Sequence, residues 1–269
     1  MNKKFHLRAS FIYSLLMFVV TYYLLQLNSQ LLTIFISNEF YLDITWFPTY
    51  LTFEPSLTAP YVPSDTKMTV AMAGPILSLV IGMVLLFLYL FEDAKLPWLS
   101  FLFFWGFIHG FNNFFGVISM NAFAEANMLN VSNILNIGVF PELIFAASAL
   151  YVLVLIGQNS GEVILIKNGN SIETSRRGRF WFMSAGVFLP MVLGSGLILL
   201  LNLMNKSLFF LPFISIIALG VPAFLKFLEK VPEFPQKNRY RHKIHWGIVL
   251  LSIIFVTLYL LLTKNGIKI

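Results

Sequence analysis

The chain lacks cysteine altogether and is poor in charged residues. Without cysteine it can form no disulfide, no thiolate metal site and no thiol nucleophile. Only 11% of its 269 residues are charged and 58% are apolar, whereas a typical soluble domain is about 25% charged. A mean hydropathy of +0.80 excludes disordered and collagen-like chains, and a soluble fold of this length cannot bury so much apolar surface. The composition predicts an integral membrane protein surrounded by membrane lipids.

Seven apolar stretches are long enough, or nearly so, to cross a hydrocarbon core about 30 Å thick as helices. They are Phe11–Phe35, Met68–Phe91, Trp98–Met120, Val139–Ile156, Phe180–Leu203, Phe209–Phe227 and Ile244–Leu262. The fourth is the shortest, and the sixth contains Pro212 and Pro222. We expect an all-α, polytopic fold, a single transmembrane domain over residues 1–269, with the first four helices forming its packed core.

The basic residues predict which way the helices run. If seven helices cross the membrane, the segments on the side of the N-terminus contain 14 of the 18 Lys and Arg. The segments on the opposite side contain the other four. Because basic residues concentrate on the cytoplasmic side, the N-terminus is expected inside and the C-terminus outside, with the first helix retained. The net charge of +6 therefore reflects topology, and we expect no nucleic-acid partner.

Two of the segments that connect the helices are expected to be ordered. Residues 37–67, on the outside, form an aromatic- and proline-rich loop that is predicted to pack or to lie at the interface. Residues 157–179, on the inside, contain the strand-like runs Glu162–Lys167 and Ser171–Ser175 around Asn168-Gly169-Asn170. Because Asn-Gly between such runs is typical of a tight turn, we predict a β-hairpin there.

The third helix gathers small and polar residues on one face. At i, i+3 and i+4 spacing this stripe contains Gly106, His109, Asn112, Asn113 and Gly116. Phenylalanines occupy much of the remaining surface, so the stripe is expected to face the second helix and the Phe surface to face lipid. For His109 three roles stay open: a hydrogen bond to a neighbouring helix, ligand or proton handling, and a water-lined path.

Small residues predict where helices approach closely. Gly74, Ser78 and Gly82 repeat along the second helix, and Gly106 and Gly110 form a small-xxx-small pair on the third. We expect these two helices to be partners. On the first helix, amides at Gln26 and Gln30 share one face near its outer end, where they are expected to hydrogen-bond to other helices.

Ala73-Gly74-Pro75, with Ser78 three positions after the proline, resembles the Ala-Gly-Pro-x-x-Asn element of site-2-type intramembrane metalloproteases. In that family an earlier helix carries the zinc motif His-Glu-x-x-His, a strand-like stretch follows it, and a later helix supplies an Asp ligand. The resemblance covers roughly Phe11–Asn130. It places the run Gln26–Gln30 where the zinc motif is expected, the extended-looking Tyr41–Phe53 after it, and Asn112 and Asn113 on the helix that precedes the Asp motif.

The residues at these positions cannot carry that family's chemistry. Zinc hydrolysis needs neutral imidazoles, a carboxylate ligand and a Glu base. Gln26 and Gln30 replace the two His, Leu27 replaces the Glu, and no Asp occurs after Asp93. The resemblance therefore implies a catalytically inactive, pseudoprotease-like relative, with no metal and no other cofactor.

The leading interpretation is a non-enzymatic multipass subunit or scaffold that binds a protein or lipid partner or a second copy of itself. A small transporter or channel using the stripe of the third helix is the first alternative. An intramembrane hydrolase is the second, although the chain contains no Gly-x-Ser-x-Gly nucleophile elbow. The expected location is the bacterial cell (inner) membrane.

Overall fold

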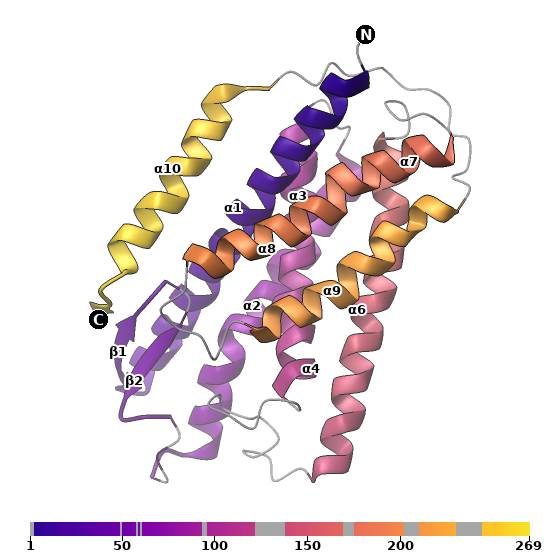
Figure 1. The fold of residues 1–269 in the computed structure, drawn as a ribbon. Helices are drawn as coiled ribbons and strands as arrows, with labels where there is room; N and C mark the ends of the chain where they lie inside the picture. Colours follow the sequence, from indigo (N-terminus) through magenta and orange to yellow (C-terminus); the bar gives the residue numbers. More distant parts are fainter. Residues whose placement is uncertain are drawn as a thin grey trace.

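The structure, a computed structural model, describes residues 3–48, 50–57, 59, 61–92, 96–121, 138–168, 175–201, 210–229 and 244–269. It is mostly helical, which confirms the all-α class. Helices α2, α3 and α6 run steeply between the two ends of the bundle, whereas the α7–α8 helix and α9 cross them obliquely, and the N- and C-termini lie at opposite ends (Figure 1). Six helices within these ranges are long and apolar enough to cross a membrane, and the shorter α9 runs beside them.

The first three helices contain the stretches expected from the sequence, although α1 begins earlier, at Lys3 instead of Phe11. Helix α1 spans Lys3–Glu39 and α2 spans Ser64–Phe91. Helix α3 spans Pro97–Phe111 and continues through a π-helical segment, η1 (Asn112–Gly116), into α4 (Val117–Asn121). The proline at the start of α3 is tolerated because the first helical N–H has no intrahelical partner.

The second half of the bundle follows the same up-and-down order. The elements are α6 (Val139–Asn168), α7 (Arg176–Met183), the π-helical η2 (Ser184–Phe188), α8 (Leu189–Leu201), α9 (Phe210–Leu225), the 3₁₀ turn η3 (Lys226–Leu228) and α10 (Trp246–Thr263). Helices α7 and α8 join through η2 into one long helix that corresponds to the fifth expected span. Each of the seven expected apolar stretches is thus helical where it is described, except for Ile244 and His245, which precede α10.

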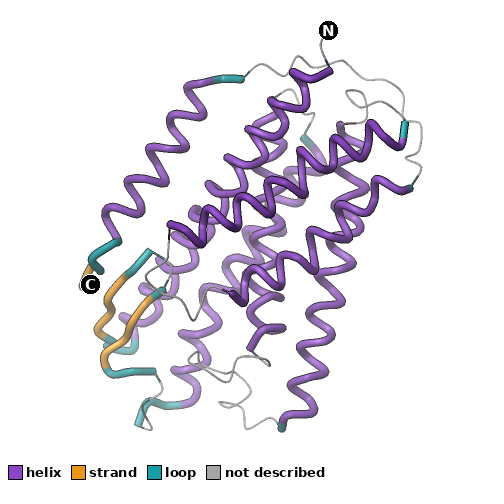
Figure 2. The backbone as a smooth tube through the Cα atoms, viewed as in Figure 1, coloured by secondary structure: helices purple, strands orange, loops and turns teal. Residues whose placement is uncertain are grey.

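A small antiparallel sheet lies at the end of the bundle that carries the C-terminus (Figure 2). Strands β1 (Asp43–Trp46) and β2 (Leu51–Glu54) form a hairpin, and β3 (Ile267–Lys268) pairs with the other edge of β1. Ile44 faces Phe53 across the hairpin, and Thr45 faces Lys268. The expected loop at residues 37–67 therefore contains the end of α1, this hairpin and the start of α2.

The core forms where α1 and α3 cross, and this arrangement overturns one expectation. Phe101, Phe104 and Phe107 of α3 are each at most 3% exposed, so the expectation that the Phe surface of the third helix faces lipid is wrong. Helix α3 packs against both α1 and α2, and Phe101 reaches Gly186 of η2. With neighbours on several sides, its aromatic side chains fill the interior.

The fourth expected helix differs most from the prediction. Helix α6 continues to Asn168, well past the expected end at Ile156. It packs mainly along α9 and adds Leu153, Ile164 and Leu165 to the core that α1 and α3 share. The expected strand Glu162–Lys167 is therefore helical, and the predicted hairpin is wrong in that half. Packing of Gly161 on Ala223 of α9 favours a helix over the local strand propensity. Most of the other expected strand, residues 171–174, lies outside the described residues.

Candidate functional site

His109 lies in the middle of the bundle and bonds to α1. Its side chain is 2% exposed, and Nε2 lies 3.0 Å from the main-chain oxygen of Phe18. Because a carbonyl only accepts, this contact assigns the proton to Nε2. The imidazole also meets the rings of Phe18 and Tyr22 edge-on, at centroid distances of 4.5 and 5.7 Å. His109 thus joins α3 to α1 through one hydrogen bond and through contacts with two aromatic rings.

Ser14, one helical turn from Phe18 on α1, joins three elements. The indole Nε1 of Trp105 donates to Ser14 Oγ at 2.7 Å, and that hydroxyl donates to the main-chain oxygen of Gly186 at 2.5 Å. Trp105 belongs to α3 and Gly186 to the π-helical segment η2. Since a π-helical turn shifts main-chain bonds out of the usual register, the serine satisfies a carbonyl at an irregular point of the helix.

Two π-helical segments, η1 and η2, lie in the third and fifth expected spans, and both contact α9. Asn112 of η1 is 4% exposed, and Asn113 is half-buried. A Cβ added to Gly116, the last residue of η1, would lie 2.5 Å from Oγ of Ser215 on α9. The polar core, formed by Ser14, Trp105 and His109, thus bonds to η2 through Ser14 and lies shortly before η1 in the chain. Segments of this kind are frequent at functional sites.

The polar stripe of the third helix is divided among three neighbours. His109 contacts α1 and Gly116 contacts α9. A Cβ on Gly110 would lie 2.6 Å from Cα of Gly82 and 2.7 Å from the carbonyl of Ser78 on α2. Gly110 lies beside the stripe, and Gly106 within it also packs on α2, but His109 and Gly116 meet α1 and α9 instead. The expectation that the whole stripe faces the second helix is therefore wrong. Because the helix is enclosed, its different sides meet different helices.

The remaining small residues also lie where helices approach. A Cβ on Gly106 would lie 2.5 Å from the side chain of Leu85 on α2. Gly74, in the Ala-Gly-Pro run, packs on Ser29 of α1. The Ala-Gly-Pro run thus meets the Gln26–Gln30 run at the α1–α2 contact.

Gln30 is the centre of a second polar cluster, near the sheet. Its Oε1 accepts from Nε1 of Trp46 and from the hydroxyl of Tyr259, both at 2.8 Å, and its Nε2 donates to the carbonyl of Phe47 at 3.1 Å. The Tyr259 hydroxyl also lies 2.7 Å from the carbonyl of Pro48. The amide is 4% exposed, and it fastens the hairpin and α10 to α1. Gln26 lies one turn earlier and is half-buried.

Several residues of these contacts could not be identified from the sequence. Ser14, Trp105 and Tyr259 lie far apart in the sequence and show no local pattern, so only the fold brings them together. Gly157 and Gly161 are different, because they form a GxxxG pair that is recognisable in the sequence. In the structure Gly157 packs on the main chain of Leu219 and Gly161 on that of Ala223, both in α9.

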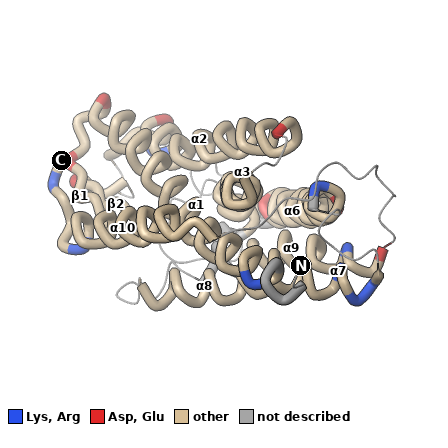
Figure 3. The backbone as a smooth tube through the Cα atoms, turned by 90° about the horizontal axis from the view of Figure 1, so that it is seen from above, with Lys and Arg blue, Asp and Glu red and all other residues tan. Residues whose placement is uncertain are grey.

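Charged residues gather towards the ends of the bundle. Figure 3, seen from the end with the N-terminus, shows basic positions near the starts of α1 and α7 and near α6. At this end Lys167 donates to the carbonyl of Glu92 at 3.2 Å and lies 4.4 Å from the centre of the Tyr89 ring. Burial raises the pKa of the Glu92 carboxyl, and the Lys167 ammonium partly opposes that shift. This cluster ties the end of α2 to the end of α6.

Among the residues that the structure describes, no three His, Cys, Asp or Glu side chains come together as metal ligands. Comparison with protein-family models, with curated proteins and with solved structures finds no match to this chain. The polar core must therefore be interpreted from its own contacts. Those contacts are hydrogen bonds between helices.

Proposed function

We propose that the protein is a non-enzymatic, multipass membrane subunit or scaffold that binds a protein or lipid partner. The observation that carries this proposal is that polar side chains at the centre of the bundle form hydrogen bonds to other helices. The bonds of His109 to Phe18 and of Trp105 to Ser14 each join two helices. Groups engaged in this way stabilise a fold, since hydrogen bonds between membrane helices are worth about 0.6–2 kcal/mol each.

The proposal includes seven membrane crossings, with the N-terminus inside and the C-terminus outside, in a bacterial cell membrane. The up-and-down order of the helices and the positions of the termini support an odd number of crossings (Figure 1). Two exposed tryptophans, Trp181 (51% exposed) and Trp246 (70% exposed), lie near the starts of α7 and α10. Tryptophan is enriched at membrane interfaces, so these residues support a boundary of the hydrocarbon core at that level.

The test is purification of the full chain from membranes in a mild detergent, followed by size-exclusion chromatography with mass determination. The proposal expects a particle heavier than the 30.7 kDa chain, containing a second protein, a tightly held lipid or further copies in a fixed ratio. A lipid-free, partner-free monomer that moves protons or solutes in reconstituted vesicles would contradict it.

A small transporter or channel is the second candidate, and the two π-helical segments favour it. Segments η1 and η2 adjoin the polar core, and local helix irregularities allow helices to shift. In this candidate Asn112 and Asn113 line the path of the solute. Loss of flux in Asn113→Leu, at unchanged thermal stability, would favour the transporter over the scaffold.

The kinship with site-2-type metalloproteases remains part of the proposal, as that of an inactive relative. The order of α1, the β1–β2 hairpin and α2 with its Ala73-Gly74-Pro75 run supports it. Gln30, at the position of a zinc-binding His in the resemblance, bonds to the hairpin and to α10 instead. In this proposal the amide of Gln30 has a structural role and stands in place of the zinc-binding His. An intramembrane hydrolase is the less favoured alternative.

A further inference from the structure

A hollow of about 250 Å³ opens beside the contact between α6 and α9, at the end of the bundle that carries the N-terminus. Its lining combines apolar and polar side chains from both helices: Gln158, Pro222, Leu225, Lys226, Leu228 and Glu229. Sites for drug-sized ligands measure about 300–1,000 Å³. The hollow is therefore of a size for a small polar group and is too small for a whole lipid.

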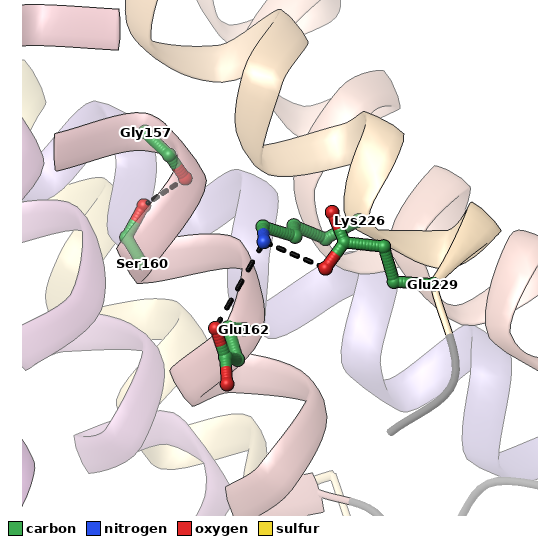
Figure 4. A network of polar contacts seen from close by, with 5 residues as sticks. All are labelled: Gly157, Ser160, Glu162, Lys226 and Glu229. Atoms are coloured by element: carbon green, nitrogen blue, oxygen red, sulfur yellow. Dashed lines mark hydrogen bonds and ion pairs between the residues drawn. The ribbon is translucent and has the colours of Figure 1, made fainter. Parts of the chain in front are cut away.

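Helices α6 and α9 pack closely beside the hollow. Gly157 and Gly161 bring the main chain of α6 directly onto α9. Gln158 and Glu162 lie one turn apart on α6, next to this glycine pair, and Pro222, Lys226 and Glu229 follow one another on the facing side of α9 and its end. The Ser160 hydroxyl donates to the carbonyl of Gly157, within α6, at 2.9 Å (Figure 4). Gln158 thus projects from a close helix crossing, whereas Lys226 begins the 3₁₀ turn that follows α9 and Glu229 caps the end of that turn.

Two charged side chains, Lys226 and Glu229, line the hollow, and Glu162 lies beside it, next to Lys226. Nζ of Lys226 lies 2.7 Å from Oε2 of Glu229 and 3.9 Å from Oε2 of Glu162 (Figure 4). The lysine side chain is only 16% exposed, whereas Glu162 and Glu229 are 47% and 62% exposed. The lysine is held between the two carboxylates, and each carboxylate keeps a face open to a further cation. The cluster carries one net negative charge.

We propose that this hollow binds the phosphoethanolamine group of a membrane lipid. The ammonium of the headgroup meets the exposed faces that Glu162 and Glu229 keep open beside Lys226, and its phosphate accepts from Lys226 and the Gln158 amide. The exposed leucines Leu225 and Leu228 (46% and 47% exposed) lie against the first part of the acyl chains. A purely anionic headgroup matches the cluster poorly, because its charge repels the two carboxylates. This inference rests on the membrane location proposed above.

The proposal is tested by native mass spectrometry of the full-length protein in detergent, titrated with phosphatidylethanolamine or phosphatidylglycerol of identical acyl chains. Alkaline carbonate extraction of the membranes comes first, because release of the protein there would refute the membrane location itself. For the wild type we expect phosphatidylethanolamine to bind about three- to tenfold more tightly than phosphatidylglycerol, in line with partly exposed ion pairs. Equal binding of the two lipids by an inserted protein would overturn the lipid site alone.

Charge-changing variants separate recognition from stability. Glu162→Gln with Glu229→Gln converts the net charge of the cluster from −1 to +1, so the preference should reverse towards phosphatidylglycerol. Lys226→Met should weaken phosphatidylethanolamine binding at least about threefold, whereas the matched control Lys264→Met, at the opposite end of the bundle, should leave it unchanged. An unchanged preference in the double variant would overturn the site. Displacement by soluble glycerophosphoethanolamine without any lipid adduct would overturn the lipid as the source of the group.

Discussion

The hydroxyl of Tyr259, in the last helix, lies 2.8 Å from the side-chain oxygen of Gln30 in the first helix, although 229 residues separate them in the sequence. The same oxygen accepts from Trp46 of the hairpin. At the other end of α10, the main-chain N–H of His245 donates to the hydroxyl of Tyr13 at 2.6 Å. Helix α10 is thus fastened to α1 near both ends, although much of its remaining surface is exposed.

Replacing Gln30 with leucine should loosen the hairpin and the last helix. The change removes the acceptor of the Trp46 indole and the donor to Phe47, and a buried unsatisfied polar group costs about 1–3 kcal/mol. We expect a lower thermal unfolding temperature and faster release of the C-terminal residues by carboxypeptidase. Asn28→Leu is the matched control, because this exposed amide bonds only within its own helix turn, to Leu24. Equal effects of the two changes would refute the role of Gln30.

The crossing of α2 and α3 should tolerate no added methyl group at Gly110. A Cβ there meets the main chain of Gly82 and Ser78, and overpacking costs about 1–3 kcal/mol. Gly196→Ala is the control, because a Cβ at Gly196 meets nothing within 4 Å and alanine favours a helix by up to about 1 kcal/mol. Thermal denaturation in detergent should therefore show Gly110→Ala less stable, and Gly196→Ala unchanged or more stable, than the wild type.

The absence of cysteine makes the proposed topology easy to test. Tyr61→Cys and Arg177→Cys each introduce a single thiol at an exposed position, one before α2 and one at the start of α7. A maleimide that cannot cross membranes should label Tyr61→Cys on intact cells and Arg177→Cys only after permeabilisation. The wild type should stay unlabelled throughout. Labelling of Arg177→Cys on intact cells would reverse the orientation.

The purified protein should carry far less than one zinc per chain. Gln26 and Gln30 offer neutral amides where zinc needs imidazoles, and Gln30 is engaged with Trp46 and Tyr259. Elemental analysis of protein prepared without chelators checks this prediction. About one zinc per chain, lost in His109→Leu, would refute it and revive the hydrolase interpretation.

The apolar runs predicted the helices well, because run length and hydropathy are local properties. The predicted end of the second helix at Phe91 and the start of the fourth at Val139 coincide with the observed bounds. The hairpin after α1 lies in a stretch that was expected to be extended only by resemblance. Its pairing with the two-residue strand at the C-terminus has no sequence signal, because it joins distant segments.

The candidate site was predictable only in part. The spacing on the third helix identified His109 and Gly110, but the partners of these residues depend on how the helices are placed in space. The Phe-rich surface of α3 is predicted to face lipid but is buried in the structure. Composition alone does not separate the two cases, because apolar residues suit both a lipid boundary and a protein interior. The Ser14–Trp105 contact needs α1 and α3 to be side by side before it can be recognised.

The hydrogen bonds of the polar core hold the helices together. The decisive variants are His109→Leu and His109→Gln, each measured for thermal stability and for proton entry into reconstituted vesicles. Leucine removes the donor to Phe18 and should destabilise the protein by about 1–2 kcal/mol, whereas glutamine keeps an N–H at similar reach and should restore most of the loss. Proton entry should match that of empty vesicles for the wild type and both variants. A wild type that admits protons, together with a His109→Leu protein that is equally stable but no longer does so, would contradict the account.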